Sequence, residues 1–174
     1  IISLDGKILS IKPEPFNILS LPIPDKKNPT LTDCLNLYTE EENLDGDNQY
    51  FNDKVGKKED AKKKLCFWSF PEILIIDLKR FTNAVKKNDV LVDFPLENLN
   101  LTNYVLGYNK KESIYDLYGV CNHSGNVFGG HYTAFIKNSN NKWYHYNDTS
   151  ITELKNHQNI KTNRAYCFFY RKKK

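Results

Sequence analysis

The sequence predicts an α+β fold that consists mainly of antiparallel sheet. Apolar and polar residues alternate with a period of two in four segments, which is typical of strands that bury one face. These segments are 114–123, 131–137, 142–148 and 165–171. Their short connections favour antiparallel pairing. No repeat or low-complexity linker divides the 174 residues, so residues 1–174 are interpreted as one unit.

The N-terminal part is predicted to contain an edge strand followed by a helix. Residues 15–23 form a short apolar run with proline near both ends, which favours a sheet edge. In residues 28–42, Thr30 can cap a helix together with Asp33 three residues on. The apolar side chains on one face of this helix are Leu31, Cys34, Leu35 and Tyr38. Cys34 is therefore expected to be buried and inert.

The middle of the chain is predicted to alternate between turns and extended segments. Residues 44–48 carry turn-forming side chains. Pro71 divides the apolar stretch 65–81 into two extended pieces, and the second piece, residues 73–78, is apolar enough for a central strand. The two segments expected to follow are a loop and another short strand, at residues 83–88 and 90–96.

Charge and hydropathy argue against two kinds of partner. The formal net charge is +4, and the densest lysine run, residues 54–64, is diluted by Glu59 and Asp60. We interpret this run as a solvated loop or hairpin rather than a nucleic-acid surface. No apolar run approaches the roughly 20 residues needed to cross a membrane, and no signal-peptide pattern is present. The chain contains no methionine, so we expect it to be a piece of a longer chain. Because it lacks a secretory signal, its four cysteines are expected to be reduced and the protein intracellular.

The most informative segment is the glycine-rich stretch that leads to His131. Gly125, Gly129 and Gly130 permit unusual backbone angles and close backbone approach, and His131 is expected to open a strand. A histidine at the mouth of a strand beside such a loop is well placed for catalysis or binding. A hairpin with an incidental histidine is the simpler alternative, and these residues alone would favour it.

Two further polar residues favour a functional role for His131 over an incidental one. Asn147 and Asp148 end the segment 142–148, one short connection after the strand that begins at His131. In an antiparallel pair the end of the second strand returns to the start of the first, so one of them should lie beside His131. Such a side chain can hold one imidazole nitrogen and leave the other to deprotonate a nucleophile. The same residues can also form a turn, and a turn is compatible with a contact to His131.

Taken together, these segments resemble the C-terminal portion of the catalytic domain of ubiquitin-specific proteases, which are ubiquitin carboxyl-terminal hydrolases. The resemblance extends over essentially the whole chain, with several motifs in family order. The matching segments are PEILIIDLKRF at 71–81, YDLYGVCNHSG at 115–125, GGHYTAFIK at 129–137, WYHYND at 143–148 and AYCFFYR at 165–171. The resemblance implies a papain-like cysteine peptidase fold and thiol-dependent cleavage after the C-terminal glycine of ubiquitin.

The resemblance also implies roles for individual residues. His131 matches the general base, Asn147 the residue that orients it, and Asp148 the adjacent acid. The loop from His123 to Gly130 matches the loop beside the ubiquitin tail. The residues implied to bind this tail are His123, Ser124, Gly125, Gly129, Gly130 and Tyr132. Ubiquitin or ubiquitinated proteins are the implied partners.

Two departures from the family pattern matter. The family's nucleophile lies in a Gly-Asn-Thr-Cys type segment, which this chain lacks. We interpret Cys66, Cys121 and Cys167 as packing residues of aromatic strands, so the upstream half of the same domain is expected to supply the cysteine. The second departure concerns a zinc-binding C-x-x-C pair, whose matching positions are Asn52 and Val55. We therefore expect neither a metal site nor a cofactor.

These observations favour one function over one alternative. The favoured hypothesis is a deubiquitinating thiol hydrolase in the intact parent, to which this chain contributes the base and its orienting residue, while the chain alone is inactive. The alternative is a ubiquitin-binding scaffold without catalysis. Retention of His131, Asn147 and Asp148 together argues against the scaffold, because a scaffold has no need of this set.

Overall fold

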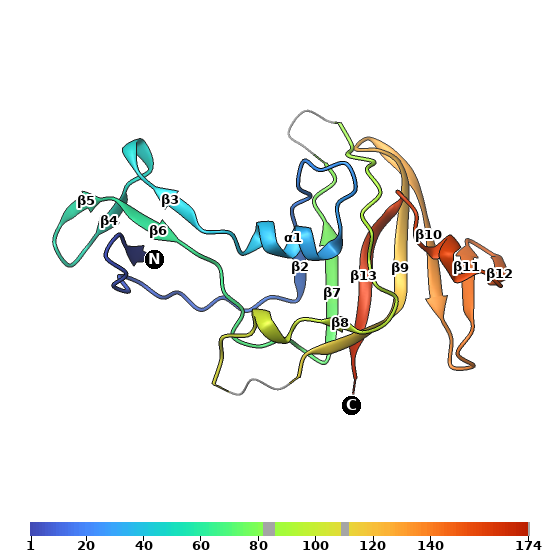
Figure 1. The fold of residues 1–174 in the computed structure, drawn as a ribbon. Coiled ribbons are helices and arrows are strands. Elements are labelled where there is room, and N and C mark those ends of the chain that lie inside the picture. The colour runs from blue at the N-terminus through green and yellow to red at the C-terminus, as the bar shows by residue number, and fades with distance from the viewer. Residues whose placement is uncertain (82–85, 109–111, 174) are drawn as a thin grey trace.

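The protein is built around one eight-stranded sheet, which contains the four strands predicted from the alternating segments (Figure 1). The computed structural model describes residues 1–81, 86–108 and 112–173. The strands lie in the order β12 (Ser150–Leu154), β11 (Trp143–Asn147), β10 (Gly129–Lys137), β9 (Ile114–Asn126), β13 (Ala165–Lys172), β7 (Ile73–Leu78) and β2 (Ile18–Leu21), and β8 (Leu99–Asn100) pairs with β9. All pairs are antiparallel except β2 with β7, which confirms the predicted class.

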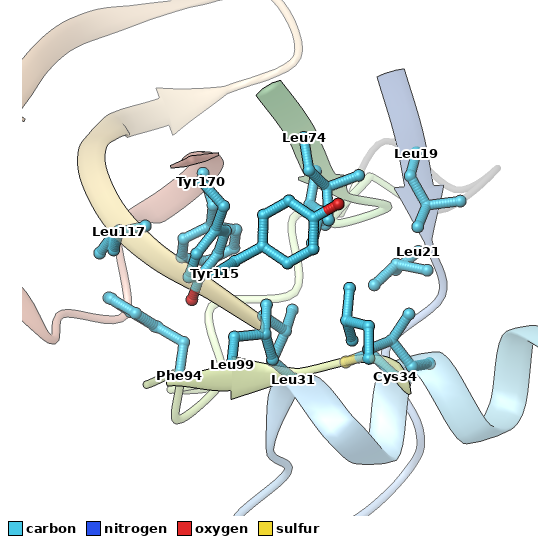
Figure 2. Close-up of a cluster of buried hydrophobic side chains, with 14 of the residues drawn as sticks. Leu19, Leu21, Leu31, Cys34, Leu74, Phe94, Leu99, Tyr115, Leu117 and Tyr170 are labelled. Carbon is cyan, nitrogen blue, oxygen red and sulfur yellow. The ribbon is translucent and has the colours of Figure 1, made fainter. Parts of the chain in front are cut away.

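One face of this sheet forms the core, as the period-two pattern requires. In β7, Leu74, Ile76 and Leu78 are fully buried, whereas Ile73, which precedes Leu74 and lies on the opposite face, is 40% exposed. Their neighbours in the core come from several elements, and Figure 2 shows Leu74 among leucine and tyrosine side chains of other strands. The predicted central position of β7 is confirmed, and so is the edge position of β2.

The predicted helix is α1 (Leu31–Tyr38), and it begins where its capping residues place it. The hydroxyl of Thr30 accepts a hydrogen bond from the Asp33 amide at 3.1 Å, and the Asp33 carboxylate accepts one from the Thr30 amide at 2.8 Å. Cys34 is fully buried in the core cluster (Figure 2), and burial raises the pKa of its thiol to about 11. Among the described residues, no helix has the length and apolar character that a membrane crossing requires.

Two smaller sheets project away from the large one (Figure 1). One contains β1 (Ile2–Ser3), β6 (Ala61–Lys63) and β3 (Glu42–Leu44), and the other is the hairpin of β4 (Tyr50–Asn52) and β5 (Lys57–Glu59). The lysine-rich run therefore forms a solvated hairpin and a strand, as expected. The predicted turn at 44–48 contains the 3-10 helix η1 (Gly46–Asn48).

Asn52 closes the turn of the β4–β5 hairpin. Its side-chain oxygen accepts from the Lys54 amide at 3.1 Å, and its side-chain nitrogen donates to Glu59 at 2.6 Å. The side-chain amide of Asn52 therefore has a structural role in this hairpin.

Two segments expected to be extended strands are not strands. Residues 65–70 make only an isolated bridge between Phe67 and Val105, because Phe67 and Phe70 turn into the core, where their ring centroids lie 4.5 Å apart. Residues 90–96 likewise make one bridge, through Asp93, because Pro95 lacks an amide donor. Within the predicted loop 83–88, residues 83–85 lie outside the described residues. Elements that the patterns did not indicate include β12 and the 3-10 helices η2 (Thr102–Tyr104) and η3 (His157–Ile160).

Candidate active site

His131 lies inside a strand rather than at its opening. It is the third residue of β10 and pairs with Ser124 of β9. The expected loop from His123 to Gly130 is therefore wrong as a loop, because strand pairing continues through Asn126 and Gly129 and only residues 127–128 turn. The correction matters for function, since a paired hairpin holds its side chains in a fixed register.

Asn147 lies beside His131, as the antiparallel argument predicts. β10 pairs with β11 from Ala134 opposite Tyr146, so Asn147 follows directly at the end of β11 nearest His131. The Asn147 side-chain oxygen lies 2.6 Å from His131 Nε2. An amide oxygen only accepts, so this bond places the ring proton on Nε2 and leaves the lone pair on Nδ1. The arrangement can therefore take up a proton at Nδ1.

Asp148 completes the polar group from the following turn. It has a left-handed φ of 50°, which aspartate tolerates better than most residues, and Asn147 pairs with Ser150 across this two-residue turn. The predicted turn and the predicted juxtaposition with His131 thus occur together. The Asp148 carboxylate lies 3.9 Å from His131 Nε2, beyond hydrogen-bond distance but close enough to stabilise an imidazolium. The side chains of His131 and Asp148 are 52% and 78% exposed, so the group is open to solvent.

The glycines of the hairpin have different structural roles. Gly125 and Gly130 pair across the hairpin, and Gly125 has a φ of 126°. A Cβ on Gly125 would lie 2.5 Å from the Gly129 carbonyl oxygen, and one on Gly130 would lie 2.4 Å from the Ser124 oxygen. A Cβ on Gly129 would meet nothing within 4 Å. Two of the three glycines are therefore required by close approach within the hairpin, whereas Gly129 leaves open space.

The other residues implied to bind a ubiquitin tail differ in exposure. Tyr132 is 56% exposed and Ser124 is half-buried, so both present atoms to solvent. His123 is only 3% exposed, because its ring packs against those of Phe81 at 5.6 Å and Tyr132 at 4.8 Å. Its ring therefore lies beneath the hairpin and does not reach the surface.

Two residues that contact this hairpin were not predicted from the sequence. Lys87 is 5% exposed, and its ammonium donates to the His123 carbonyl oxygen at 2.6 Å and pairs with Asp89 at 3.0 Å. Tyr166 of β13 lies 6.1 Å from the His123 ring. Both come from segments distant in sequence from the hairpin, and no local pattern marks either as part of the site.

The four cysteines differ from one another, and none hydrogen-bonds His131 within the described part of the chain. Burial raises the pKa of the Cys121 thiol, and it raises that of Cys167 to about 12. Cys121 pairs with Cys167 and belongs to the opposite strand face from His131, because it pairs across β9–β10 with Ala134. Cys66 is exposed and lies outside any strand, so its assignment to a packed aromatic strand is wrong.

Solved structures identify the class of fold. A SAGA DUB module of Ubp8, Sgf11, Sus1 and Sgf73 bound to monoubiquitin matches with a TM-score of 0.77 at 33% identity, over 92% of this chain and 36% of that chain. The same module bound to ubiquitin aldehyde matches with a TM-score of 0.75 at 32% identity, over 91% of this chain and 36% of that chain. The chain therefore has the β-rich part of a papain-like catalytic domain of the ubiquitin-specific protease type.

Sequence comparison then places the chain in a family. The family model for ubiquitin carboxyl-terminal hydrolase matches residues 26–170. The chain belongs to the ubiquitin carboxyl-terminal hydrolase family. Ubiquitin carboxyl-terminal hydrolase 9 of Arabidopsis thaliana is 40% identical over 147 residues, which are 82% of this chain and 16% of that protein. Ubiquitin carboxyl-terminal hydrolase 2 of Homo sapiens is 38% identical over 163 residues, which are 90% of this chain and 27% of that protein. The chain thus spans well under half of the length of both relatives.

Proposed function

We propose that residues 1–174 are the C-terminal portion of a deubiquitinase catalytic domain and supply the general base and its orienting residue. The observation that carries the proposal is the 2.6 Å hydrogen bond from His131 to Asn147 in a chain of the ubiquitin carboxyl-terminal hydrolase family. The proposed substrates are ubiquitin-conjugated proteins, and the proposed setting is intracellular. No step of this proposal uses a metal or a cofactor.

The proposed reaction begins with proton transfer to His131. Nδ1 takes the proton of a cysteine thiol, and the thiolate attacks the carbonyl carbon of the last glycine of ubiquitin. Nδ1 then returns the proton to the departing amine, and a thioester remains. Water, deprotonated by the same nitrogen, attacks the thioester carbonyl and the carbon–sulfur bond breaks. Ubiquitin leaves with a free carboxylate, and the departing cysteine thiolate takes the proton back from Nδ1. Asn147 holds the ring in one orientation throughout, and Asp148 stabilises the transient imidazolium.

The nucleophile is proposed to come from the upstream part of the same catalytic domain. Support comes from the cysteines of this chain, since Cys34 is fully buried and Cys121 and Cys167 have raised thiol pKa values. Cys66 is exposed, but no base among the described residues is hydrogen-bonded to it. The solvent exposure of His131 also fits a second wall that closes over the site.

The β9–β10 hairpin is proposed to form one side of the channel for the ubiquitin tail. A tail that ends in two glycines can pass close to backbone, and Gly129 leaves room for it, with no atom within 4 Å of a Cβ position. Tyr132, which is 56% exposed, and Ser124 are the side chains proposed to contact the tail. Gly125 and Gly130 allow the two strands of the hairpin to approach closely, and the buried His123 ring packs beneath the hairpin.

The proposal is tested by intact mass spectrometry with ubiquitin that carries a thiol-reactive C-terminal group. This chain alone should form no adduct, whereas the parent protein should form one that is lost when its upstream cysteine is replaced by alanine. An adduct on this chain alone would overturn the external nucleophile.

Hydrolysis of a fluorogenic ubiquitin amide by the parent tests the base. His131→Ala should abolish turnover, while the exposed His157→Ala serves as the matched control and should not affect it. A parent that binds ubiquitin but neither labels nor turns over would instead support a scaffold.

A further inference from the structure

A second histidine, His123, belongs to the same hairpin as His131 but has a different environment. Residues alternate between the two faces of a strand, and His123 pairs with Tyr132, so His123 lies on the opposite face from His131. Three rings surround His123, those of Phe81, Tyr132 and Tyr166, at 5.6, 4.8 and 6.1 Å. The His123 side chain is therefore fixed by packing, and the proposed reaction does not use it.

The His123 ring touches the backbone that precedes the base. A Cβ placed on Gly130 would lie 2.3 Å from His123 Nε2 and 3.1 Å from its Cδ2. The bare α-carbon of Gly130 thus rests on the edge of the imidazole. Gly130 is joined directly to His131, so a movement of this ring displaces the backbone that carries the base.

The backbone of His123 accepts a hydrogen bond from a buried lysine side chain. The buried ammonium of Lys87 donates to the His123 carbonyl oxygen at 2.6 Å and pairs with Asp89 at 3.0 Å. Within the described residues, the Nδ1 atom of His123 is buried without a hydrogen-bond partner. A buried polar atom without a partner costs free energy, so packing alone would favour an apolar ring here. Desolvation and the nearby Lys87 ammonium lower the pKa of His123, which keeps the ring neutral.

We propose that His123 is a positioning residue, whose buried ring supports Gly130 and so keeps His131 in register with Asn147. The support comes from the contact with Gly130, the three surrounding rings and the Lys87 clamp on the same residue. The inference rests on the proposed function for its kinetic consequence only. The structural consequence, the orientation of the His131 ring, can be measured without catalysis.

The direct test is NMR of the histidine ring nitrogens in this chain. In the wild type, neutral His131 should carry its proton on Nε2. His123→Ala removes the support and should convert His131 to a mixture of both tautomers, whereas His123→Phe keeps a flat ring and should preserve the Nε2 tautomer. His157→Ala is the control and should leave His131 unchanged. A purely structural role for His123 would lower stability without altering the tautomer of the folded chain.

Kinetics of the parent protein provide the second readout. His123→Ala should lower kcat for a fluorogenic ubiquitin amide by about 10- to 100-fold with KM within about twofold, because a displacement of about 1 Å costs up to about 100-fold. His123→Phe should retain more than about half of kcat. Unchanged His131 tautomer and kcat in His123→Ala would overturn the proposal.

The variants separate the possible failures. If His123→Ala does not fold, His123→Phe decides: a folded Phe variant with a mixed His131 tautomer would overturn the packing argument, and one that preserves the tautomer would support it. A wild-type parent without hydrolytic activity would count against the proposed function. The comparison of tautomers would still test the positioning role in that case.

Discussion

Gly130→Ala is expected to destabilise the protein, because the added methyl group has no room. It would lie 2.3 Å from His123 Nε2 and 2.4 Å from the Ser124 carbonyl oxygen. The imidazole could tilt away, but the carbonyl belongs to the paired backbone of β9 and can move only if the hairpin opens. Overpacking of this kind costs about 1–3 kcal/mol. For a chain of this size, each kcal/mol corresponds to about 2–4 °C in Tm, so we expect a decrease of about 2–12 °C.

Gly129→Ala is the matched control, one residue earlier on the same strand. Its methyl group would meet nothing within 4 Å, and Gly129 has no left-handed φ. The substitution also removes backbone freedom from the unfolded chain, which is worth up to about 1 kcal/mol. Differential scanning calorimetry of the two variants should therefore show a clear decrease in Tm for Gly130→Ala and an equal or higher Tm for Gly129→Ala. Equal Tm values for Gly130→Ala and the wild type would refute the close-packing argument.

The remaining predictions concern Asn147, the environment of His123 and the cap of helix α1. In the parent, Asn147→Ala should lower kcat at least about 10-fold, but by less than the roughly 10²–10⁴-fold that general-base catalysis is worth; an unchanged kcat would remove Asn147 from the site. In this chain, Lys87→Met should raise the pKa of His123, measured by NMR titration, because the Lys87 ammonium helps to lower it. The lowered pKa means that the unfolded chain binds this proton first, so the free energy of unfolding should fall as the pH drops below about 6.5, and His123→Phe should reduce that fall. Thr30→Ala should cost about 0.5–2 kcal/mol in urea unfolding, because it removes the hydroxyl that accepts from the Asp33 amide, while the bond from the amide of residue 30 to Asp33 remains possible; no loss would show that the cap is dispensable.

The parts of the fold that local chemistry determines were predictable from the sequence. Thr30 and Asp33 mark the start of α1 because their reciprocal hydrogen bonds involve neighbours only. The strands β9, β10, β11 and β13 follow from their alternation, since one buried face imposes a period of two. The proximity of Asn147 to His131 also follows, because antiparallel pairing fixes which strand ends meet.

Features that depend on distant segments were not predictable. Residues 90–96 have the composition of a strand, but a strand also needs a neighbouring edge to pair with, and Pro95 withholds a donor. The glycines of the hairpin indicated a loop because glycine permits both a loop and a close approach, and only the pairing of Gly125 with Gly130 distinguishes them. The burial of His123 depends on Phe81 and on Tyr166, whose segments meet the hairpin only in the folded sheet.

In the proposed function, the two faces of the β9–β10 hairpin have different roles. His131 belongs to the face that meets Asn147, and its side chain is 52% exposed, which suits its proposed role as a general base. His123 belongs to the other face and is 3% exposed, so its ring contacts the backbone at Gly130 rather than solvent. Glycine at position 130 connects the two faces, since only a residue without a side chain lets the buried His123 ring reach the backbone next to His131. A side chain at position 130 is therefore expected to disturb His131, because it would displace the His123 ring or the Ser124 carbonyl group.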